Sequence, residues 1–200
     1  PPKHYQETNF NHVISTIKAY PLATVISVKD AKVLVTHLPL TYKETKQGAG
    51  KLIGHIDKAN RQTSLLSNGN PCTIIFNGPD SYISPSIFES KQLPTWNYIK
   101  IHIEGSVSKI ENAYDVKESI VNMTAQLEGL EQKFVLDKND VRMERLIEFI
   151  EGFEVDITSW EGKFKISQDK PNAEQMLAKS ALENSEPTHK LNYINSIFDS

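Results

Sequence analysis

Apolar and polar residues alternate along several stretches of the chain, and this two-residue period predicts β-strands. The clearest alternation covers residues 97–110, where isoleucines at every second position are separated by polar side chains. The run at 72–76 is continuously apolar, as expected of a strand that is covered on both faces. The remaining predicted strands cover residues 22–28, 32–40, 51–56, 153–160 and 163–167.

Apolar residues at helical spacing predict helices between these strands. The first helix covers residues 9–20 and stops at Pro21, because proline cannot continue a helix. The tail after Ser185 carries enough apolar residues that we expect it to pack on the body of the protein or on a partner. The other predicted helices cover residues 58–67, 113–127, 141–151 and 172–183.

The order of these elements predicts the fold class. At least six short, mostly consecutive strands with inserted helices are typical of an antiparallel barrel with helices at its edges. The chain has 200 residues, 38% of them apolar, which is enough for one domain with a real core. We expect a main domain over residues 1–170 and a helical tail over 171–200.

The segment 76–98 separates two predicted strands and is rich in proline and aromatic residues. Its prolines are Pro79, Pro85 and Pro94, which argue against a long helix or an inner strand. We therefore predict a long ordered loop. The loop forms either one wall of a ligand site, using Tyr82, Trp96 and Tyr98, or a structural loop packed by its own aromatic side chains.

Composition excludes several classes of function. The net charge of −3 gives no basic footprint for nucleic acid over the chain as a whole, which leaves only a local cluster of basic residues open. The single cysteine, Cys72, rules out an internal disulfide and any Cys-x-x-Cys metal site. No apolar run approaches the roughly 18 residues of a membrane span, and we expect a cytoplasmic protein. The histidines are scattered, so no metal site is expected, and without a catalytic motif no catalytic residue can be assigned.

Two stretches could bind a ligand by their chemistry. The run 54–62, G-H-I-D-K-A-N-R-Q, predicts a strand end followed by a helix start, where free N–H groups and cations suit a phosphate. A capped surface helix with solvated cations is the alternative. In the run 160–168, Lys163 and Lys165 share one face of a predicted strand, which is also typical of a solvated lysine face.

A set of short motifs resembles one known family. The motifs occur in one order: P-K-H-Y near the start, P-L-A-T-V at 21–25, T-H-L-P-L at 36–40, G-H-I-D-K-A-N at 54–60, F-N-G-P-D-S-Y-I-S-P-S at 76–86, P-T-W-N-Y at 94–98, G-F-E-V-D-I-T at 152–158 and E-G-K-F-K-I-S-Q at 161–168. Together they resemble the PaiB family of FMN-binding negative transcriptional regulators, over about residues 2–171.

The resemblance implies a split β-barrel of the flavin-binding type, related to the pyridoxamine-phosphate oxidases. It also implies FMN as cofactor and a homodimer with the flavin site at the subunit interface. On the phosphate side, the positions that match are Thr36, His37, His55, Lys58, Ala59, Asn60 and Gln62. On the side closed by the partner subunit, they are Thr95, Trp96, Asn97 and Lys163 or Lys165.

Three functions are compatible with these observations. The first is negative transcriptional regulation through flavin binding or sensing, although the charge balance does not support direct DNA contact. The second is a flavin-dependent oxidoreductase of the pyridoxamine-phosphate-oxidase-like group without direct DNA binding. The third is an enzyme without flavin that uses His37 or His55 as a general base.

Overall fold

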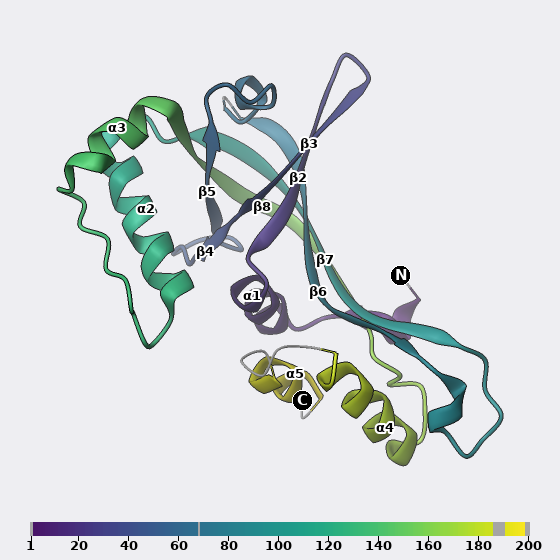
Figure 1. Cartoon of the computed structure of the whole chain (residues 1–200). Helices are drawn as coiled ribbons and strands as arrows, with labels where there is room; N and C mark the ends of the chain where they lie inside the picture. The colour runs from purple at the N-terminus through teal and green to yellow at the C-terminus, as the bar shows by residue number, and fades with distance from the viewer. Residues whose placement is uncertain (1, 68, 186–190, 199–200) are drawn as a thin grey trace. The chain divides into compact units, whose positions relative to one another are not determined.

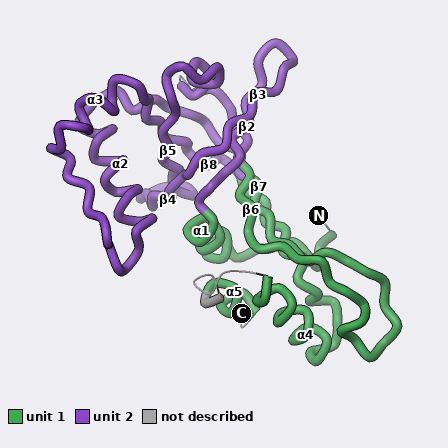
Figure 2. The backbone as a smooth tube through the Cα atoms, viewed as in Figure 1, with its two compact units in different colours: residues 1–20, 75–102, 160–200 green, residues 21–74, 103–159 purple. Residues whose placement is uncertain are grey.

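The computed structural model describes residues 2–67, 69–185 and 191–198 (Figure 1). The chain forms two compact units, coloured separately in Figure 2: residues 1–20, 75–102 and 160–200 belong to unit 1, and residues 21–74 and 103–159 to unit 2. The expected division at residue 170 stays a prediction. Residues 186–190 and 199–200 of the predicted tail, and the side chain of Leu191, lie outside the described residues.

Unit 2 is built on an antiparallel sheet. It contains β2 (Leu22–Lys29), β3 (Lys32–Pro39), β4 (Thr41–Lys43), β5 (Lys51–Asp57) and parts of β6 (Asn70–Ile83), β7 (Thr95–Lys109) and β8 (Ile150–Lys165). The strands are hydrogen-bonded in the order β3-β2-β6-β7-β8-β5-β4. Asp30 and Ala31 form the β2–β3 turn with positive φ angles of 49° and 58°, as a tight two-residue hairpin turn requires.

Alternating side chains of this sheet form the core of unit 2. The fully buried side chains include Val25, Leu40, Leu52, Ile74 and Phe153. Gly54 in β5 leaves room for two side chains of the core, because a Cβ atom there would lie 2.3 Å from Leu40 Cδ2 and 2.8 Å from Phe153 Cζ. Its place in this strand therefore reflects close packing of side chains over the backbone.

Two helices are inserted between β7 and β8. α2 (Ala113–Glu128) begins at Asn112, whose Oδ1 accepts the Tyr114 N–H at 2.8 Å, and α3 (Val141–Phe149) begins at Asp140 in the same way. Both helices were predicted from their apolar spacing, with α3 ending at Phe149, two residues earlier than expected. Met123 of α2 and Met143 of α3 are buried.

Unit 1 combines the other ends of β6, β7 and β8 with three helices. The helices are α1 (Phe10–Ala19), α4 (Asn172–Glu183) and α5 (Leu191–Phe198), which lie together on one side of these strands in Figure 1. β1 (Gln6–Glu7) pairs with β8, and short 3-10 turns occur at η1 (Lys3–Tyr5) and η3 (Pro85–Ile87). The predicted helices 9–20 and 172–183 are thereby confirmed.

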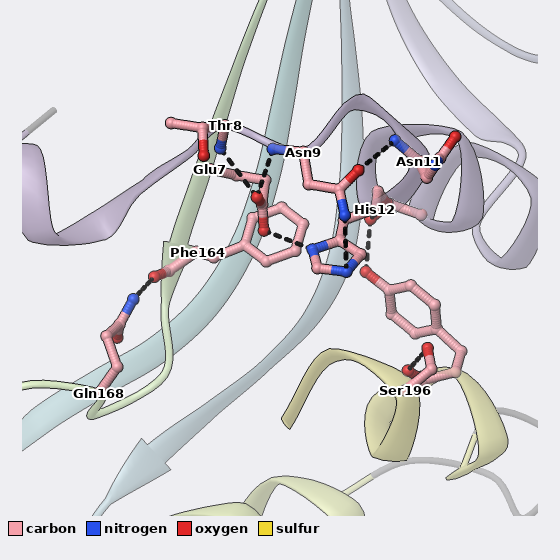
Figure 3. A network of polar contacts seen from close by, with 10 residues as sticks. Glu7, Thr8, Asn9, Asn11, His12, Phe164, Gln168 and Ser196 are labelled. Atoms are coloured by element: carbon pink, nitrogen blue, oxygen red, sulfur yellow. Dashed lines mark hydrogen bonds and ion pairs between the residues drawn. The ribbon is translucent and has the colours of Figure 1, made fainter. Parts of the chain in front are cut away.

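Hydrogen bonds hold the start of α1 in place and join α5 to α1 (Figure 3). Glu7 accepts the N–H groups of Thr8 and Asn9 through Oε1, and its Oε2 lies 2.8 Å from His12 Nδ1. The Tyr193 hydroxyl on α5 is hydrogen-bonded to Thr16 on α1. The apolar tail therefore packs on the body of the chain, because Ile194 and Ile197 are also buried.

The predicted loop 76–98 is wrong in extent. β6 continues to Ile83 and β7 begins at Thr95, so only the residues between them leave the sheet. Before Gly78 the buried side chains of β6 stand at even-numbered positions, as Phe76 does. After Pro79 the even-numbered Asp80 is exposed and the odd-numbered Ile83 is buried. The alternation thus shifts at Gly78–Pro79, as it does at a β-bulge, and a bulge is a place where a strand tolerates proline.

The separation of the predicted strands 153–160 and 163–167 is also wrong, because β8 is continuous through Glu161 and Gly162. Gly162 lies opposite Glu7 of β1, and a Cβ atom on Gly162 would lie 2.9 Å from the Glu7 Cβ. This glycine therefore allows a neighbouring strand to approach closely, and it does not mark a change of direction.

Candidate functional site

The predicted helix at 58–67 does not form. Asp57 Oδ1 accepts the Ala59 N–H at 2.7 Å, and Asn60 Oδ1 accepts the Gln62 N–H at 2.9 Å. Such short polar side chains compete with a helix for backbone N–H groups, so two side-chain turns replace it and lead into the 3-10 turn η2 (Thr63–Leu65). Without a helix there is no helix dipole, and any anion here must be held by side chains and single N–H groups.

Lys58 is engaged by α3. Its backbone N–H donates to Phe149 O at 2.8 Å, and its ammonium donates to the carbonyl oxygens of Ile147 and Glu148, both at 2.9 Å. A lysine at the end of a helix satisfies carbonyl groups that have no partner in the helix. The main role of Lys58 in this structure is therefore to cap α3.

Thr36 and His37 lie on opposite faces of β3, so the structure does not bring both to one site. The Asn60 amide donates to the Thr36 hydroxyl at 3.2 Å, which joins Thr36 to the turn after β5. His37 Nδ1 lies 3.0 Å from the Thr24 hydroxyl on the neighbouring strand, and its side chain is exposed. Thr36 thus belongs with Asn60, and His37 does not.

Gln62 holds the same turn against β2 from inside the protein. Gln62 is 1% exposed, and its side-chain amide donates to Val25 O at 3.2 Å and to Ser27 Oγ at 3.0 Å. Its Oε1 atom is buried and has no hydrogen-bond partner among the described residues. Both of its donated bonds are used by β2, so Gln62 positions the turn.

This turn lines a polar cavity of about 580 Å³ in unit 2. The cavity is lined by polar and charged residues: Lys58, Asn60, Arg61, Thr63, Ser64, Ser67, Lys109, Glu111 and Glu151. The ammonium of Lys109 is paired with Glu151 at 2.9 Å. Arg61 is exposed and forms no hydrogen bond or ion pair with any residue that the structure describes. Arg61 is one of the cations of the run 54–62 that suit a phosphate, although it was not among the positions that the PaiB resemblance implied.

His55 is directed to α2, away from this group of residues. Its Nε2 lies 2.8 Å from Ser119 Oγ, and the Ser119 hydroxyl donates to Val116 O at 2.8 Å. The Ser119 proton is therefore already used, so His55 Nε2 is the donor. A base that activates a serine needs the opposite arrangement, with the hydroxyl donating to the imidazole. This contact fastens α2 to β5 and does not form a nucleophile–base pair.

The second group of predicted residues lies in unit 1, at the start of β7 and the end of β8. The Lys165 ammonium donates to the Thr95 hydroxyl. Asn97 is fully buried, and its amide exchanges hydrogen bonds of 2.9 Å and 3.2 Å with the Ser167 hydroxyl. Thr95 and Lys165 are thus brought together, whereas the Asn97 amide is committed to Ser167 in the interior.

Aromatic side chains and a lysine form an accessible surface beside them, which we name the aromatic face: Tyr82, Trp96, Tyr98 and Lys163. Trp96 is 52% exposed and its ring meets Tyr82 edge to face, with centroids 6.4 Å apart. The Lys163 ammonium lies 5.1 Å from the centroid of the Tyr98 ring. This face can contact a flat ligand through ring surfaces and one cation.

Residues 1–159 match the family described as "Putative FMN-binding domain". The chain belongs to this family. Among curated proteins, the protease synthase and sporulation protein PAI 2 of Bacillus subtilis is 25% identical over 186 residues, covering 92% of this chain and 89% of that protein. Both findings agree with the PaiB resemblance of the short motifs.

Two solved structures show the fold of this family member. An FAD- and heme-binding protein from Mycobacterium smegmatis has a TM-score of 0.64 at 15% identity, covering 87% of this chain and 80% of that chain. The flavocytochrome Anf3 from Azotobacter vinelandii also has a TM-score of 0.64, at 16% identity, covering 86% of this chain and 74% of that chain. The predicted fold class, an α+β, mainly β split barrel with peripheral helices, is confirmed.

Two further properties concern the described part of the chain. Its His, Cys, Asp and Glu side chains nowhere gather in a group of three or more that could hold a metal ion. None of its helices has both the length and the apolar character needed to cross a membrane.

The partly buried His55 predicts a pH-dependent stability. Burial lowers its pKa from 6.5 to about 4. Between these values the unfolded chain binds the proton and the folded chain does not, so the free energy of unfolding falls as the pH drops from 6.5 to 4. The full effect is on the order of 3 kcal/mol, of which about 2 kcal/mol is lost at pH 5.

Urea unfolding at pH 7.5 and pH 5 measures this loss. In the variant His55→Gln we expect the loss between the two pH values to be smaller by about 2 kcal/mol. His102→Gln is the matched control, because the His102 side chain is 51% exposed. Equal losses in the wild type and His55→Gln would contradict the prediction.

Proposed function

We propose that this protein binds FMN, with the phosphate in the polar cavity of the turn after β5. The observation that carries this proposal is the uncommitted guanidinium of Arg61 in that cavity, beside the Asn60 amide and the hydroxyls of Ser64 and Ser67. These groups are hydrogen-bond donors, and an arginine can bind two phosphate oxygens at once. The donor set fits a phosphate monoester, and the family match supports a flavin.

The chain's own residues have a limited task in this proposal. FMN, when bound, supplies the redox chemistry, so the protein needs to bind and orient it. Arg61 and Asn60 hold the phosphate, and Gln62 and Thr36 keep the turn in place through Val25, Ser27 and Asn60. The absence of a serine–histidine catalytic pair at His55 is consistent with this division of labour.

We further propose a homodimer in which the aromatic face of one subunit closes the flavin site of the other. The PaiB resemblance supports this arrangement, as does the exposure of Trp96 and Tyr82 at 52% and 50%. Large aromatic side chains are enriched where protein surfaces are buried by a partner or a ligand. The two groups of predicted residues then serve one site from two subunits.

The proposed biological role is negative transcriptional regulation through flavin binding or sensing. Support comes from the PaiB resemblance and from the match to PAI 2 of Bacillus subtilis over most of this chain. A flavin-dependent oxidoreductase without direct DNA contact is the alternative, and the net charge of −3 favours it.

Titration with FMN, followed by flavin fluorescence, tests the phosphate site. We expect Arg61→Gln to weaken FMN binding about tenfold or more, because a charge-assisted phosphate contact is lost. Riboflavin, which has no phosphate, should bind the variant and the wild type equally. Lys58→Met should instead lower the free energy of unfolding, by about 1 kcal/mol, because the cap of α3 is lost. An unchanged FMN affinity in Arg61→Gln would overturn the assignment, and no binding to wild type up to about 1 mM FMN would overturn the function.

The same titration tests the aromatic face. Trp96→Ala should weaken flavin binding more than Tyr82→Ala, because the larger ring offers more area for stacking.

Mixed dimers of Arg61→Gln and Trp96→Ala subunits test the shared site. If the two groups come from different subunits, the mixed dimer regains one site with wild-type affinity. A mixture in which every site stays weak, or a monomeric solution mass, contradicts the arrangement.

Direct DNA contact is testable by its salt dependence. A protein that neutralises phosphates with lysine and arginine loses affinity linearly in log K against log salt. With a net charge of −3 we expect no such binding by purified protein to its own promoter DNA, with or without FMN. A steep salt slope at low ionic strength would show direct contact and reject the alternative function.

A further inference from the structure

The loop that leads into the aromatic face is held by the C-terminal helix α4. This loop covers residues 88–94, between η3 and β7, and Trp96 is the second residue after it. Glu174 in the first turn of α4 accepts hydrogen bonds from two side chains of the loop. The Ser90 hydroxyl donates to Glu174 Oε1 at 2.6 Å, and the Gln92 amide donates to Glu174 Oε2.

A second contact comes from Lys170, two residues before α4. The Lys170 ammonium donates to Gln92 Oε1 and lies 5.5 Å from the centroid of the Phe88 ring. Gln92 Nε2 also lies within hydrogen-bond distance of Ser90 Oγ, at 2.9 Å. Both ends of the Gln92 amide are therefore occupied, one by a carboxylate and one by an ammonium. Such contacts with ionised partners are stronger than those between neutral groups.

The rest of the loop has few other attachments. Phe88 is buried against Ile83 and Ala178, which anchors the beginning of the loop. Beyond it, Lys91 is exposed and Leu93 is 86% exposed. Segments with few buried contacts open locally at low free-energy cost, so the contacts of Glu174 and Lys170 supply most of what orders residues 89–93.

The contacts that fix the start of β7 come from the same part of the chain. At the start of β7, Thr95 is hydrogen-bonded to Lys165, and Asn97 is hydrogen-bonded to Ser167. The loop before it is hydrogen-bonded to Lys170 and Glu174. All four partners follow residue 159, where the match to the FMN-binding family ends. The C-terminal part of the chain thus holds the edge that carries Trp96.

We propose that Glu174 is a positioning residue for Trp96: with Lys170 it latches the loop 88–94 to α4 and so sets the place of the aromatic face. The inference rests on the proposed function only in taking flavin as the ligand of that face. The latch itself is a property of the chain without ligand, so the two can fail separately.

Limited proteolysis of the full chain without ligand tests the latch. Trypsin cuts after Lys91 only when the loop opens, and mass spectrometry identifies that cut. We expect Glu174→Ala to speed this cleavage about tenfold, since two hydrogen bonds to a carboxylate are lost. Glu183→Ala on the same helix is the matched control, with the same change of charge, and should leave the rate unchanged. Equal rates in wild type and Glu174→Ala, or equal acceleration in Glu183→Ala, would overturn the proposal.

A double-mutant cycle shows whether the effect passes through the loop. Gln92→Ala should accelerate cleavage as Glu174→Ala does, and the double variant should be no faster than the faster single variant. Effects that multiply would mean that Glu174 and Gln92 act independently, which rejects the latch.

The position of Trp96 is followed by its own fluorescence in a Trp160→Phe background, where Trp96 is the remaining tryptophan. Glu174→Ala should increase acrylamide quenching of Trp96 and weaken FMN binding, whereas Glu183→Ala should do neither. If wild type binds no FMN but Glu174→Ala still speeds cleavage and quenching, the latch stands and the proposed function fails. If FMN binds and Glu174→Ala changes neither quenching nor affinity, the positioning role fails alone.

Discussion

The pairing of three long strands is the constraint on which the other features depend. β6, β7 and β8 each contribute residues to both compact units, so their register decides which side chains meet in each. The register depends on close approaches of backbone to side chains at glycines. A Cβ on Gly105 would lie 2.3 Å from Val155 Cγ1, and one on Gly78 would lie 3.0 Å from Ile99 Cβ. A one-residue shift of any of these strands would turn its side chains to the other face.

Two residues of the run 54–62 hold other elements of unit 2 in place. Lys58 caps α3 and the partly buried imidazole of His55 holds α2, so two predicted ligand residues bind neighbouring elements. Arg61, in contrast, lines the polar cavity and is not used to hold another element. A motif that looks uniformly suited to an anion is thus divided by the structure into residues that build the site and residues that can bind in it.

The aromatic face depends on contacts from later in the chain. Trp96 and Tyr98 are placed by β7, but the start of that strand is held by Lys165 and Ser167, and the loop before it is held by Glu174. The C-terminal helices therefore do more than cover apolar side chains of unit 1. Helix α4 contacts the loop that precedes the face, and the proposed latch links this helix to the position of Trp96.

The sequence by itself determined most elements and the family. Local periodicity was sufficient for α2, α4 and the alternating strand β7, because their spacing reflects one buried face. The tertiary structure decided the rest. The turn at 57–62 is not a helix because Asp57 and Asn60 take the backbone N–H groups, and β6 continues through Pro79 because a bulge shifts its faces. The roles of Lys58, His55 and Asn97 follow from the partners that folding brings beside them, and those partners lie 64 to 90 residues away in the chain.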